Sequence, residues 1–446
     1  MLMSMLMLIS MFIIFVYSLY RYLYLYQSQL EIVKRALPEF FLESVWEYLL
    51  FMSRVDGNLN TSHSSEQDEI LELAAELLPA SDLIKNPYIR AKQVEIFFAL
   101  VVNDEERGTS VFAGLERRVH RLLIGNMMKF YVQVESLGTS TAFYDKFSIR
   151  YHLTKVLLKI LSFDSAGFSQ GTLKLDDATF VRFINLCVSD ATYLLDESLS
   201  KLSEIREKQV QMQTTPLSPE EQKALAQTER QCQSLLSLGS ESLTFLARLT
   251  AAIPAAFLSP EILDRLTAML NFNLVLLAGP RCSKLKVNNP GKYNFNPRAL
   301  LGSLIEIYLA LGNEEAFVRS VAGDERSFSP QLFESCVGIM KRTGMSGDKI
   351  ESFTKLSNLI APGVESTQNV IEPESIPDEY LDPILFNLMV DPVRLPSSRM
   401  IVDRATIQAH LLNDPHDPFN RQPLRIEDVE PVAELKAEIE AFLGKQ

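Results

Sequence analysis

Apolar residues recur every three or four positions along most of the chain, from residue 37 to about residue 359. The spacing is clearest over residues 180–188 and over residues 300–309, which lie between Pro297 and Gly312. Such spacing places apolar side chains on one face of an α-helix, and Pro before and Gly after a segment are typical helix boundaries. No fixed repeat length relates the segments. The pattern predicts a mainly α protein, built as an irregular α-solenoid of packed helix pairs.

Two polar stretches interrupt this pattern. Residues 201–230 are rich in Gln, Glu and Lys, and we expect two solvent-facing helix extensions joined by a loop. Residues 361–375 collect Pro, Gly, Ser and acidic residues with little periodicity, which is typical of a domain linker. The linker separates a helical core, residues 37–360, from a small C-terminal domain, residues 376–446.

The C-terminal domain shows a different pattern. Residues 393–395 and 400–402 flank a Pro-Ser-Ser sequence, which predicts a β-hairpin. Asp403 follows at the N-cap position of a helix of about ten residues, with Ile407 facing inward. Pro431 is expected to open a last helix. The order of these elements predicts a small α+β domain after the helical core.

The N-terminal apolar segment, residues 1–36, has several interpretations. Its first twenty residues are uncharged and long enough to cross a bilayer. Arg21, Lys34 and Arg35 follow, so the positive-inside rule would leave the rest of the chain in the cytosol. The segment is a membrane anchor, a buried helix of the large core, or an artefact of the gene model. A signal peptide is disfavoured because no small-residue cleavage site follows.

The net charge of −13 on 446 residues argues against broad binding to a phosphate backbone. A basic cluster at Arg117, Arg118, His120 and Arg121 is better explained as a solvated or ion-paired helix face. Motifs for phosphate-binding loops, dinucleotide binding and zinc proteases are missing from the sequence. We therefore expect no cofactor and no nucleic-acid partner.

The few cysteines and histidines restrict the chemistry further. No cysteine follows Cys336, and Cys187, Cys232 and Cys336 all lie on apolar helix faces, so a catalytic thiol is disfavoured. Cys282 has basic neighbours but no other sign of activation. Residues 366–446 hold two histidines and no cysteine, too few for two structural zinc sites. Hydrogen bonds and ion pairs must hold this domain's loops, and the candidates are Ser397, Ser398, Asp403, Arg404, His410, Asp417 and Asn420.

Sequence stretches on both sides of the linker resemble one known family. The run IPDEYLDPILFNLMVDPVRLPSSRMIVDRATIQAHLLNDPHDPFNRQPL, from Ile376 on, resembles a U-box, the zinc-free relative of the RING domain. Upstream, LPEFFLESVWEYLLFMSR, IKNPYIRAKQVEIFF and LSPEILDRLTAMLNFNLVLLAGPRCSKLKV resemble the helical core of the ubiquitin conjugation factors called E4. The resemblance runs from about residue 37 to residue 443. Relatives are longer on the N-terminal side, so we expect a truncated member.

The resemblance implies a U-box ubiquitin ligase that recruits a ubiquitin-charged conjugating enzyme and forms no covalent intermediate of its own. Matching DPILFNLM places Ile384 and Phe386 on the groove for the conjugating enzyme, and matching DPFNRQPL adds Pro418 and Pro423. Exposed apolar residues between Asp-Pro breaks suit an interface. Arg421 takes the linchpin position, where its guanidinium would hold the ubiquitin thioester in an attack-ready pose.

The resemblance also implies partners and a location. Ubiquitylated substrates, destined for proteasomal degradation, and an AAA ATPase segregase are expected partners, and the cytoplasm and nucleus are the expected location. One alternative is a non-catalytic helical adaptor that only binds proteins of the ubiquitin pathway. Another is a ligase tethered to a membrane through residues 1–20.

Overall fold

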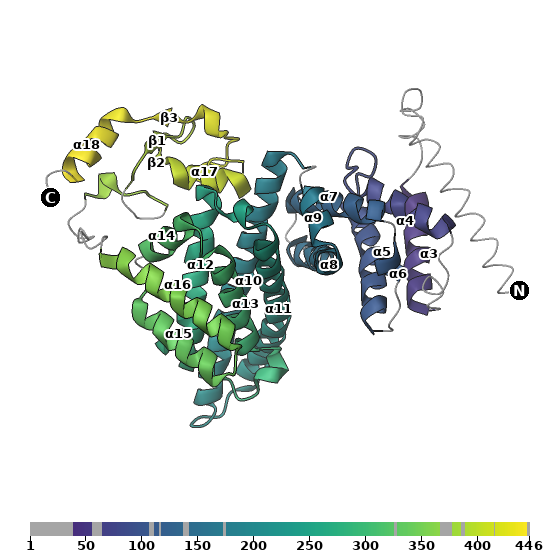
Figure 1. The fold of residues 1–446 in the computed structure, drawn as a ribbon, viewed down its shortest axis with the longest axis horizontal. Coiled ribbons are helices and arrows are strands. Elements are labelled where there is room, and N and C mark those ends of the chain that lie inside the picture. Colours follow the sequence, from purple (N-terminus) through teal and green to yellow (C-terminus); the bar gives the residue numbers. More distant parts are fainter. Residues whose placement is uncertain are drawn as a thin grey trace, which may run out of the picture. The chain divides into compact units, whose positions relative to one another are not determined.

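The helical part of the chain forms two sets of packed helices (Figure 1). A computed structural model describes residues 39–55, 65–106, 111–115, 117–136, 142–172, 175–324, 328–365, 377–384, 389–413 and 415–443. The chain divides into two compact units, Met1–Phe183 and Ile184–Gln446. Mainly α structure is confirmed. The N-terminal segment 1–36 and its possible anchor lie outside the described residues, and none of the described helices is long and apolar enough to span a membrane.

Helices of the first unit pack mostly against near neighbours in the chain, as an irregular solenoid requires. Helix α5 lies between α3 and α8, and α7 contacts α4, α8 and α9. Large apolar side chains such as Trp46 and Phe97 are fully buried between them. The helices are α3 (Phe40–Val55), α4 (Ser65–Leu77), α5 (Pro87–Glu106), α6 (Val111–Gly114), α7 (Arg117–Gln133), α8 (Ala142–Phe163) and α9 (Ser165–Thr172).

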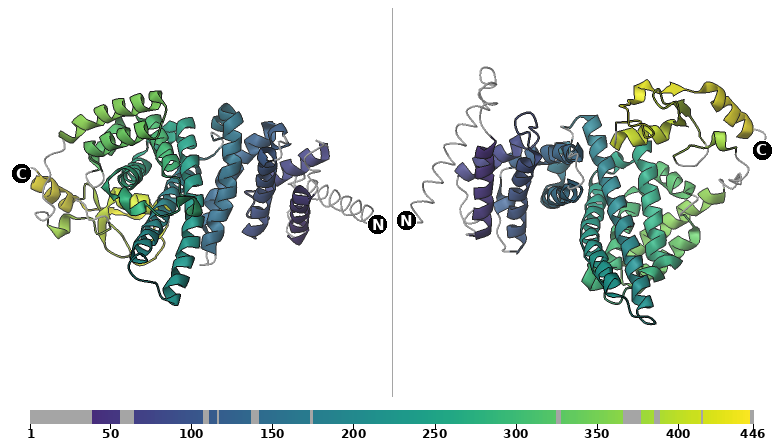
Figure 2. Two further views of the ribbon diagram at one scale, coloured as in Figure 1. Left: turned by 90° about the horizontal axis from the view of Figure 1, so that it is seen from below. Right: turned by 180° about the vertical axis from the view of Figure 1, so that it is seen from behind.

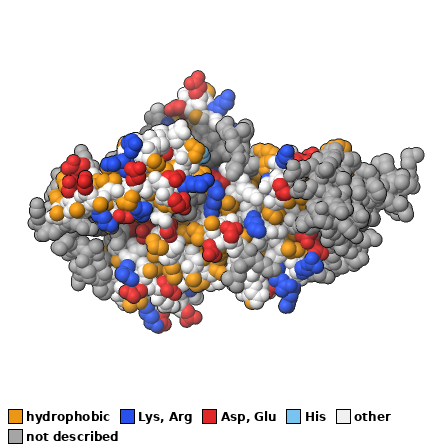
Figure 3. All heavy atoms as spheres, turned by 90° about the horizontal axis from the view of Figure 1, so that it is seen from above, with side chains coloured by type: hydrophobic (Ala, Val, Ile, Leu, Met, Phe, Trp, Pro, Cys, Tyr) orange, Lys and Arg blue, Asp and Glu red, His pale blue; other side chains and the backbone are white. Residues whose placement is uncertain are grey.

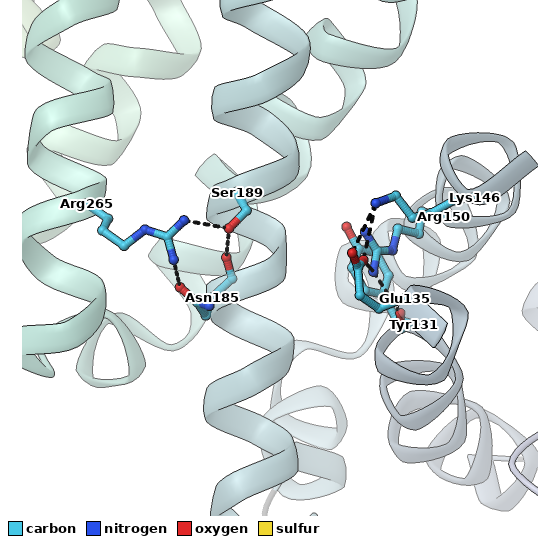
Figure 4. Close-up of polar contacts among 7 residues, drawn as sticks. All are labelled: Tyr131, Glu135, Lys146, Arg150, Asn185, Ser189 and Arg265. Carbon is cyan, nitrogen blue, oxygen red and sulfur yellow. Dashed lines mark hydrogen bonds and ion pairs between the residues drawn. The ribbon is translucent and has the colours of Figure 1, made fainter. Parts of the chain in front are cut away.

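A buried arginine links two helical segments within this unit (Figure 4). Arg150 of α8 is nearly fully buried and donates to the carbonyl of Tyr131 at 3.2 Å and to Glu135 at 2.7 Å. Lys146 contacts the same carboxylate at 3.2 Å. Burial alone would raise the pKa of Glu135, but the two cations lower it below its ordinary value. The carboxylate is therefore ionised at neutral pH and compensates the buried guanidinium.

The three arginines of the predicted basic cluster, Arg117, Arg118 and Arg121, are exposed or ion-paired as expected, but His120 is not. Arg118 forms an ion pair with Glu72 at 2.9 Å, while the His120 ring is buried and contacts the Phe112 carbonyl at 2.9 Å. Cationic and anionic side chains are intermixed over the described surface seen in Figure 3. This mixture is typical of a protein with ordinary surface solvation and not of a phosphate-backbone track.

Two long helices, α10 (Asp177–Gln211) and α11 (Pro219–Ala252), form an antiparallel pair joined by a short loop. The two helices lie close together at Gly239, where an added Cβ would lie 3.4 Å from Leu194. Lys208 and Glu221, 3.7 Å apart, face each other near the loop. The two polar helix extensions predicted over residues 201–230 are thus confirmed.

The remaining helices of the second unit pack onto this pair and onto one another. Helix α13 contacts α11, α12 contacts α14 and α15, and α16 contacts α13, α14 and α15. Tyr308 lies at the centre, with its ring against those of Phe317, Phe333 and Phe353. The helices are α12 (Pro260–Ala278), α13 (Pro297–Leu311), α14 (Glu315–Gly323), α15 (Pro330–Arg342) and α16 (Gly347–Glu365).

Sequence signals placed several of these boundaries. Pro297 begins α13, and the helix ends at Leu311, one residue before Gly312, as predicted. Helix α16 continues to Glu365, five residues into the segment 361–375 expected as a linker.

A polar contact joins α12 to α10 within the second unit (Figure 4). Arg265 of α12 donates to Asn185 and to Ser189 of α10.

The C-terminal domain is small and mixed, as the two further views of the ribbon also show (Figure 2). Strands β1 (Pro392–Arg394), β2 (Ile401–Asp403) and β3 (Glu430–Pro431) form an antiparallel sheet in the order β2-β1-β3. Helix α17 (Arg404–Asn413) contacts strand β2, and helix α18 (Ala433–Leu443) contacts strand β1. The hairpin is confirmed, with Val393 opposite Val402.

The expected role of Pro431 is wrong. Pro431 pairs with Val393 in β3, and α18 begins two residues later at Ala433. A proline suits a short outer strand as well as a first helical turn, because neither needs its missing N–H. Pairing with β1 decides between the two here.

Candidate functional site

The C-terminal domain has a small apolar core. Six apolar side chains are buried together, and Ile384, Leu411 and Ile426 pack at its edge. Two segments of the domain are called loop 1 (residues 377–391) and loop 2 (residues 414–425), and their described parts contain little regular structure. The buried side chains are Val393, Leu395, Val402, Ile407, Leu424 and Val429.

Two aspartates hold loop 1 against the start of α17. The side chain of Asp403 accepts hydrogen bonds from the backbone N–H groups of Val390 at 2.6 Å and Asp391 at 2.9 Å. Its other oxygen accepts from the N–H of Ala405 at 2.9 Å, which confirms the predicted helix N-cap. Asp382, fully buried, accepts from the N–H of Asp403 at 2.6 Å and from that of Ile384 at 2.7 Å.

Asp391 connects loop 1 to both helices of the domain. One of its oxygens accepts from Arg404 at 2.6 Å and the other from Lys436 at 2.9 Å. These two hydrogen bonds lower the pKa of Asp391 below its ordinary value. Because the group is partly exposed, solvent screens the two ion pairs and limits their contribution to stability.

Asp417 organises loop 2. Its carboxylate is fully buried and accepts from the Ser397 hydroxyl at 2.8 Å, the Ser398 N–H at 3.2 Å and the Phe419 N–H at 2.9 Å. Burial would raise the pKa of Asp417, but these hydrogen bonds lower it below its ordinary value. The carboxylate thereby joins the tip of the β1–β2 hairpin to the start of loop 2.

Arg421 lies in a tight turn at the exposed side of loop 2. Its backbone has φ of 61°, in the left-handed region, and its N–H donates to the Asp417 carbonyl at 2.9 Å. The amide oxygen of Asn420 accepts from the Gln422 N–H at 3.0 Å. A left-handed backbone is unfavourable for a residue with a side chain, so the turn must be held by these contacts. The turn fixes the backbone position of Arg421, an exposed residue.

The other sequence-predicted residues lie around the same loops. Ile384 is half-buried at the edge of the core, Pro418 is half-buried in loop 2, and Pro423 is exposed. His410 of α17 contacts the His416 carbonyl at 2.9 Å and so connects α17 to loop 2. Phe386 lies outside the described residues. The structure thus places Pro418, Arg421 and Pro423 together on loop 2, but it does not describe Phe386, the second residue of the expected apolar pair with Ile384.

Several residues of the site were missed by sequence reasoning. Asp382, Asp391 and Lys436 all make hydrogen bonds that hold loop 1, and Val390 and Phe419 are exposed apolar side chains on the two loops. One signal was available, because Asp382, Asp391 and Asp417 each precede a proline. A following proline disfavours helical backbone at the aspartate, whose side chain readily accepts hydrogen bonds from nearby N–H groups.

The cysteines lie where the apolar patterns placed them. Cys187, Cys232 and Cys336 are buried, and burial raises the pKa of the Cys232 and Cys336 thiols to about 12. Thiols of this kind are protonated and poorly nucleophilic at neutral pH. Among the residues that the structure describes, no cluster of three or more His, Cys, Asp or Glu side chains is arranged to hold a metal ion.

Comparisons with known proteins agree on one family. A family described as ubiquitin elongating factor core matches residues 2–361, and the U-box domain family matches residues 376–446. The first match includes the N-terminal segment, whereas the sequence resemblance was expected to begin only near Leu37.

Three curated relatives are similar over nearly the whole chain. Ubiquitin conjugation factor E4 of Schizosaccharomyces pombe is 40% identical over 92% of this chain and 42% of its own length. E4 ubiquitin-protein ligase UFD2 of Saccharomyces cerevisiae is 36% identical over 91% of this chain and 44% of its own length. Probable ubiquitin conjugation factor E4 of Arabidopsis thaliana is 34% identical over 91% of this chain and 40% of its own length. The chain spans about two fifths of each of these relatives, and it belongs to the ubiquitin conjugation factor E4 family, with that family's elongating-factor core followed by a U-box.

Proposed function

We propose that this chain is a ubiquitin ligase that binds a ubiquitin-charged conjugating enzyme through loops 1 and 2 of its U-box. It promotes transfer of ubiquitin from that enzyme to a lysine and so extends ubiquitin chains on substrates. The observation that carries the proposal is the arrangement of loop 2, in which buried Asp417 fixes a turn that presents exposed Arg421. Family membership supports the same reading.

The two loops combine the features that such an interface needs. Loop 1 contributes half-buried Ile384 and exposed Val390, and loop 2 contributes Phe419 and Pro423. Apolar side chains at the edge of a small domain, surrounded by polar groups, form a typical protein-binding patch. The carboxylate network holds the loops before any partner binds, which reduces the ordering cost of binding.

Arg421 would act by orientation. A thioester that moves freely relative to the conjugating enzyme seldom meets a lysine in a reactive pose, and restricting it raises the frequency of attack. The planar guanidinium can donate to several acceptors at once, so it can contact the enzyme and the ubiquitin tail together. The ligase itself supplies no attacking group in this mechanism. That fits the buried, protonated state of Cys232 and Cys336.

The test is ubiquitin-chain formation by the full chain with a broadly active conjugating enzyme. Ile384→Ala should weaken binding of the conjugating enzyme. Arg421→Ala should retain binding within about twofold but slow transfer by about tenfold or more, equivalent to at least ~1.4 kcal/mol of transition-state stabilisation. Arg399→Ala is the matched control, because Arg399 is also an exposed arginine with a left-handed backbone in the same domain, at φ of 60°.

The outcomes separate the candidate functions. Equal transfer rates for Arg421→Ala and wild type would overturn the role of Arg421. A folded wild type that binds conjugating enzymes but builds no chains with any of them would favour the alternative, a helical adaptor without ligase activity.

Further parts of the proposal rest on the family resemblance. We propose ubiquitylated proteins as substrates, an AAA ATPase segregase as a partner, and the cytoplasm and nucleus as the location. Co-purification of the ATPase with the tagged chain, and its loss on deleting the helical core while the U-box is kept, would test the partner. Imaging of the tagged chain would test the location.

A further inference from the structure

Four serine or threonine residues of this chain stand directly before a proline, and three of them have a structural explanation. Ser218, Ser259 and Ser329 are the N-cap residues of α11, α12 and α15, each followed by proline at the first helical position. Serine at the N-cap and proline next to it are a common way to begin a helix. The Ser218 and Ser329 hydroxyls accept capping hydrogen bonds, whereas the Ser259 hydroxyl makes none but is buried away from solvent.

Thr215 is the exception. It lies between the end of α10 at Gln211 and the start of α11 at Pro219, and Pro216 after it begins no helix. Neighbouring hydroxyls are engaged, since Thr214 donates to the Gln211 carbonyl at 3.1 Å and Ser218 accepts from the Glu221 N–H at 3.3 Å. Within the described residues, the Thr215 hydroxyl has no hydrogen bond, although its N–H donates to the Gln211 carbonyl at 2.9 Å.

The loop around Thr215 is accessible from solvent. Residues 211–216 are all exposed, and buried Leu217 then anchors the chain before α11 begins. The loop joins the ends of the two longest helices described, α10 and α11 (Figure 1). Val210 is 46% and Met212 50% exposed, although both are apolar. An enzyme could therefore reach Thr215 and its flanking residues after only the last turn of α10 opens, which costs little at a helix end.

We propose that Thr215 is a phosphorylation site for a proline-directed Ser/Thr protein kinase. The Thr215 hydroxyl oxygen attacks the γ-phosphorus of ATP and a new O–P bond forms. The bond from that phosphorus to the β-phosphate oxygen breaks, ADP leaves, and the hydroxyl proton passes to the kinase's base. Pro216 supplies the residue after the acceptor that this kinase class selects.

Phosphorylation would change the electrostatics of the loop. A phosphate carries about −1.5 to −2 charges at neutral pH and would lie at the C-terminal end of α10, where the helix dipole is also negative. Lys208 is the neighbouring cation, and it now lies 3.7 Å from Glu221 and 3.2 Å from Gln211. The phosphate would compete with Glu221 for Lys208 and place charge beside exposed Val210 and Met212.

The test uses the purified full chain, a purified proline-directed kinase and ATP, with phosphosites mapped by mass spectrometry. Wild type should incorporate one phosphate, at Thr215. Thr215→Val removes the hydroxyl while keeping the side-chain shape, and Pro216→Ala keeps the hydroxyl but removes the recognised proline. Both should lose at least about nine tenths of the incorporation, equivalent to a tenfold lower rate. Thr214→Val is the matched control and should incorporate phosphate as wild type does.

Other results would overturn the proposal. One is phosphate mainly on Ser218, Ser259 or Ser329, since it would show that N-cap serines are equally accessible. Undiminished incorporation in Pro216→Ala would show that the proline plays no part. A folded wild type, checked by circular dichroism, that takes up no phosphate with any kinase of this class would also overturn it.

Discussion

Replacing Asp417 by asparagine tests whether one buried carboxylate holds loop 2. The shape hardly changes, but an NH₂ group takes the place of one oxygen. In the folded domain the two oxygens accept from Ser397 at 2.8 Å, Ser398 N–H at 3.2 Å and Phe419 N–H at 2.9 Å. The amide must turn its NH₂ group toward at least one of these backbone N–H groups. A buried N–H without an acceptor costs about 1–3 kcal/mol, and the remaining bonds lose their charge assistance, so we expect a loss of about 2 kcal/mol.

The assay must report on the U-box within the full chain. Tryptophan fluorescence does not report on the U-box, because the single tryptophan, Trp46, lies in the first unit. Amide hydrogen exchange measured by mass spectrometry, over peptides covering residues 397–400 and 417–423, reports local opening. A loss of about 2 kcal/mol corresponds to about 30-fold faster exchange. Asp428→Asn, at an exposed position of the same domain, is the control and should change stability by less than about 0.5 kcal/mol.

The pH dependence gives an independent check. Although burial acts to raise it, the pKa of Asp417 in the folded domain is below the ordinary value of 3.8 because of its hydrogen bonds. The stabilisation is therefore fully present above that ordinary value and is lost as pH falls through the folded-state pKa. Wild type and Asp417→Asn should differ at neutral pH and converge in acid. Equal exchange rates at pH 7, or a difference that persists unchanged into acid, would refute the reasoning.

Three other perturbations have clear expectations. Asp391→Asn should remove two partly exposed ion pairs and destabilise the U-box by only about 1 kcal/mol, an effect that shrinks with added salt in urea titrations followed by hydrogen exchange. Gly239→Val should destabilise the second unit by about 1–3 kcal/mol, because the valine side chain would collide with Leu194 across the helix pair. Urea unfolding followed by circular dichroism measures this loss, and Gly239→Ala, the control, should be nearly neutral. At neutral pH the Cys336 thiol should react with iodoacetamide at least about 100-fold more slowly than the thiol of partly exposed Cys282, because burial raises the pKa of Cys336 to about 12. Comparable reaction rates of the two cysteines, measured in mapped peptides, would contradict the burial of Cys336.

Local sequence signals accounted for the elements themselves. Spacing of apolar residues by three and four placed α10 and α13, and Pro297 and Gly312 placed the boundaries of α13. Asp403, predicted as an N-cap residue, likewise marked the start of α17. Each of these signals depends on residues within one or two helical turns, so their physical cause is contained in a short stretch of sequence.

The partners of the buried carboxylates could not be read from the sequence. Asp391 contacts Lys436, 45 residues later, and Asp417 contacts Ser397, 20 residues earlier. The sequence limited the loop-holding groups to a set of polar residues by excluding zinc, but it gave no pairing. Asp382 was not in that set, although it is fully buried.

The sequence by itself therefore determined the helices, the hairpin, the family resemblance and the absence of enough zinc ligands in the C-terminal domain. Tertiary structure decided which N–H groups each carboxylate accepts from, and how Arg421 is presented by its left-handed turn. It also decided that Pro431 pairs with β1 instead of opening a helix. The physical reason is range: helix and turn preferences act over a few residues, whereas these contacts form only when segments distant in the chain are brought together by the core.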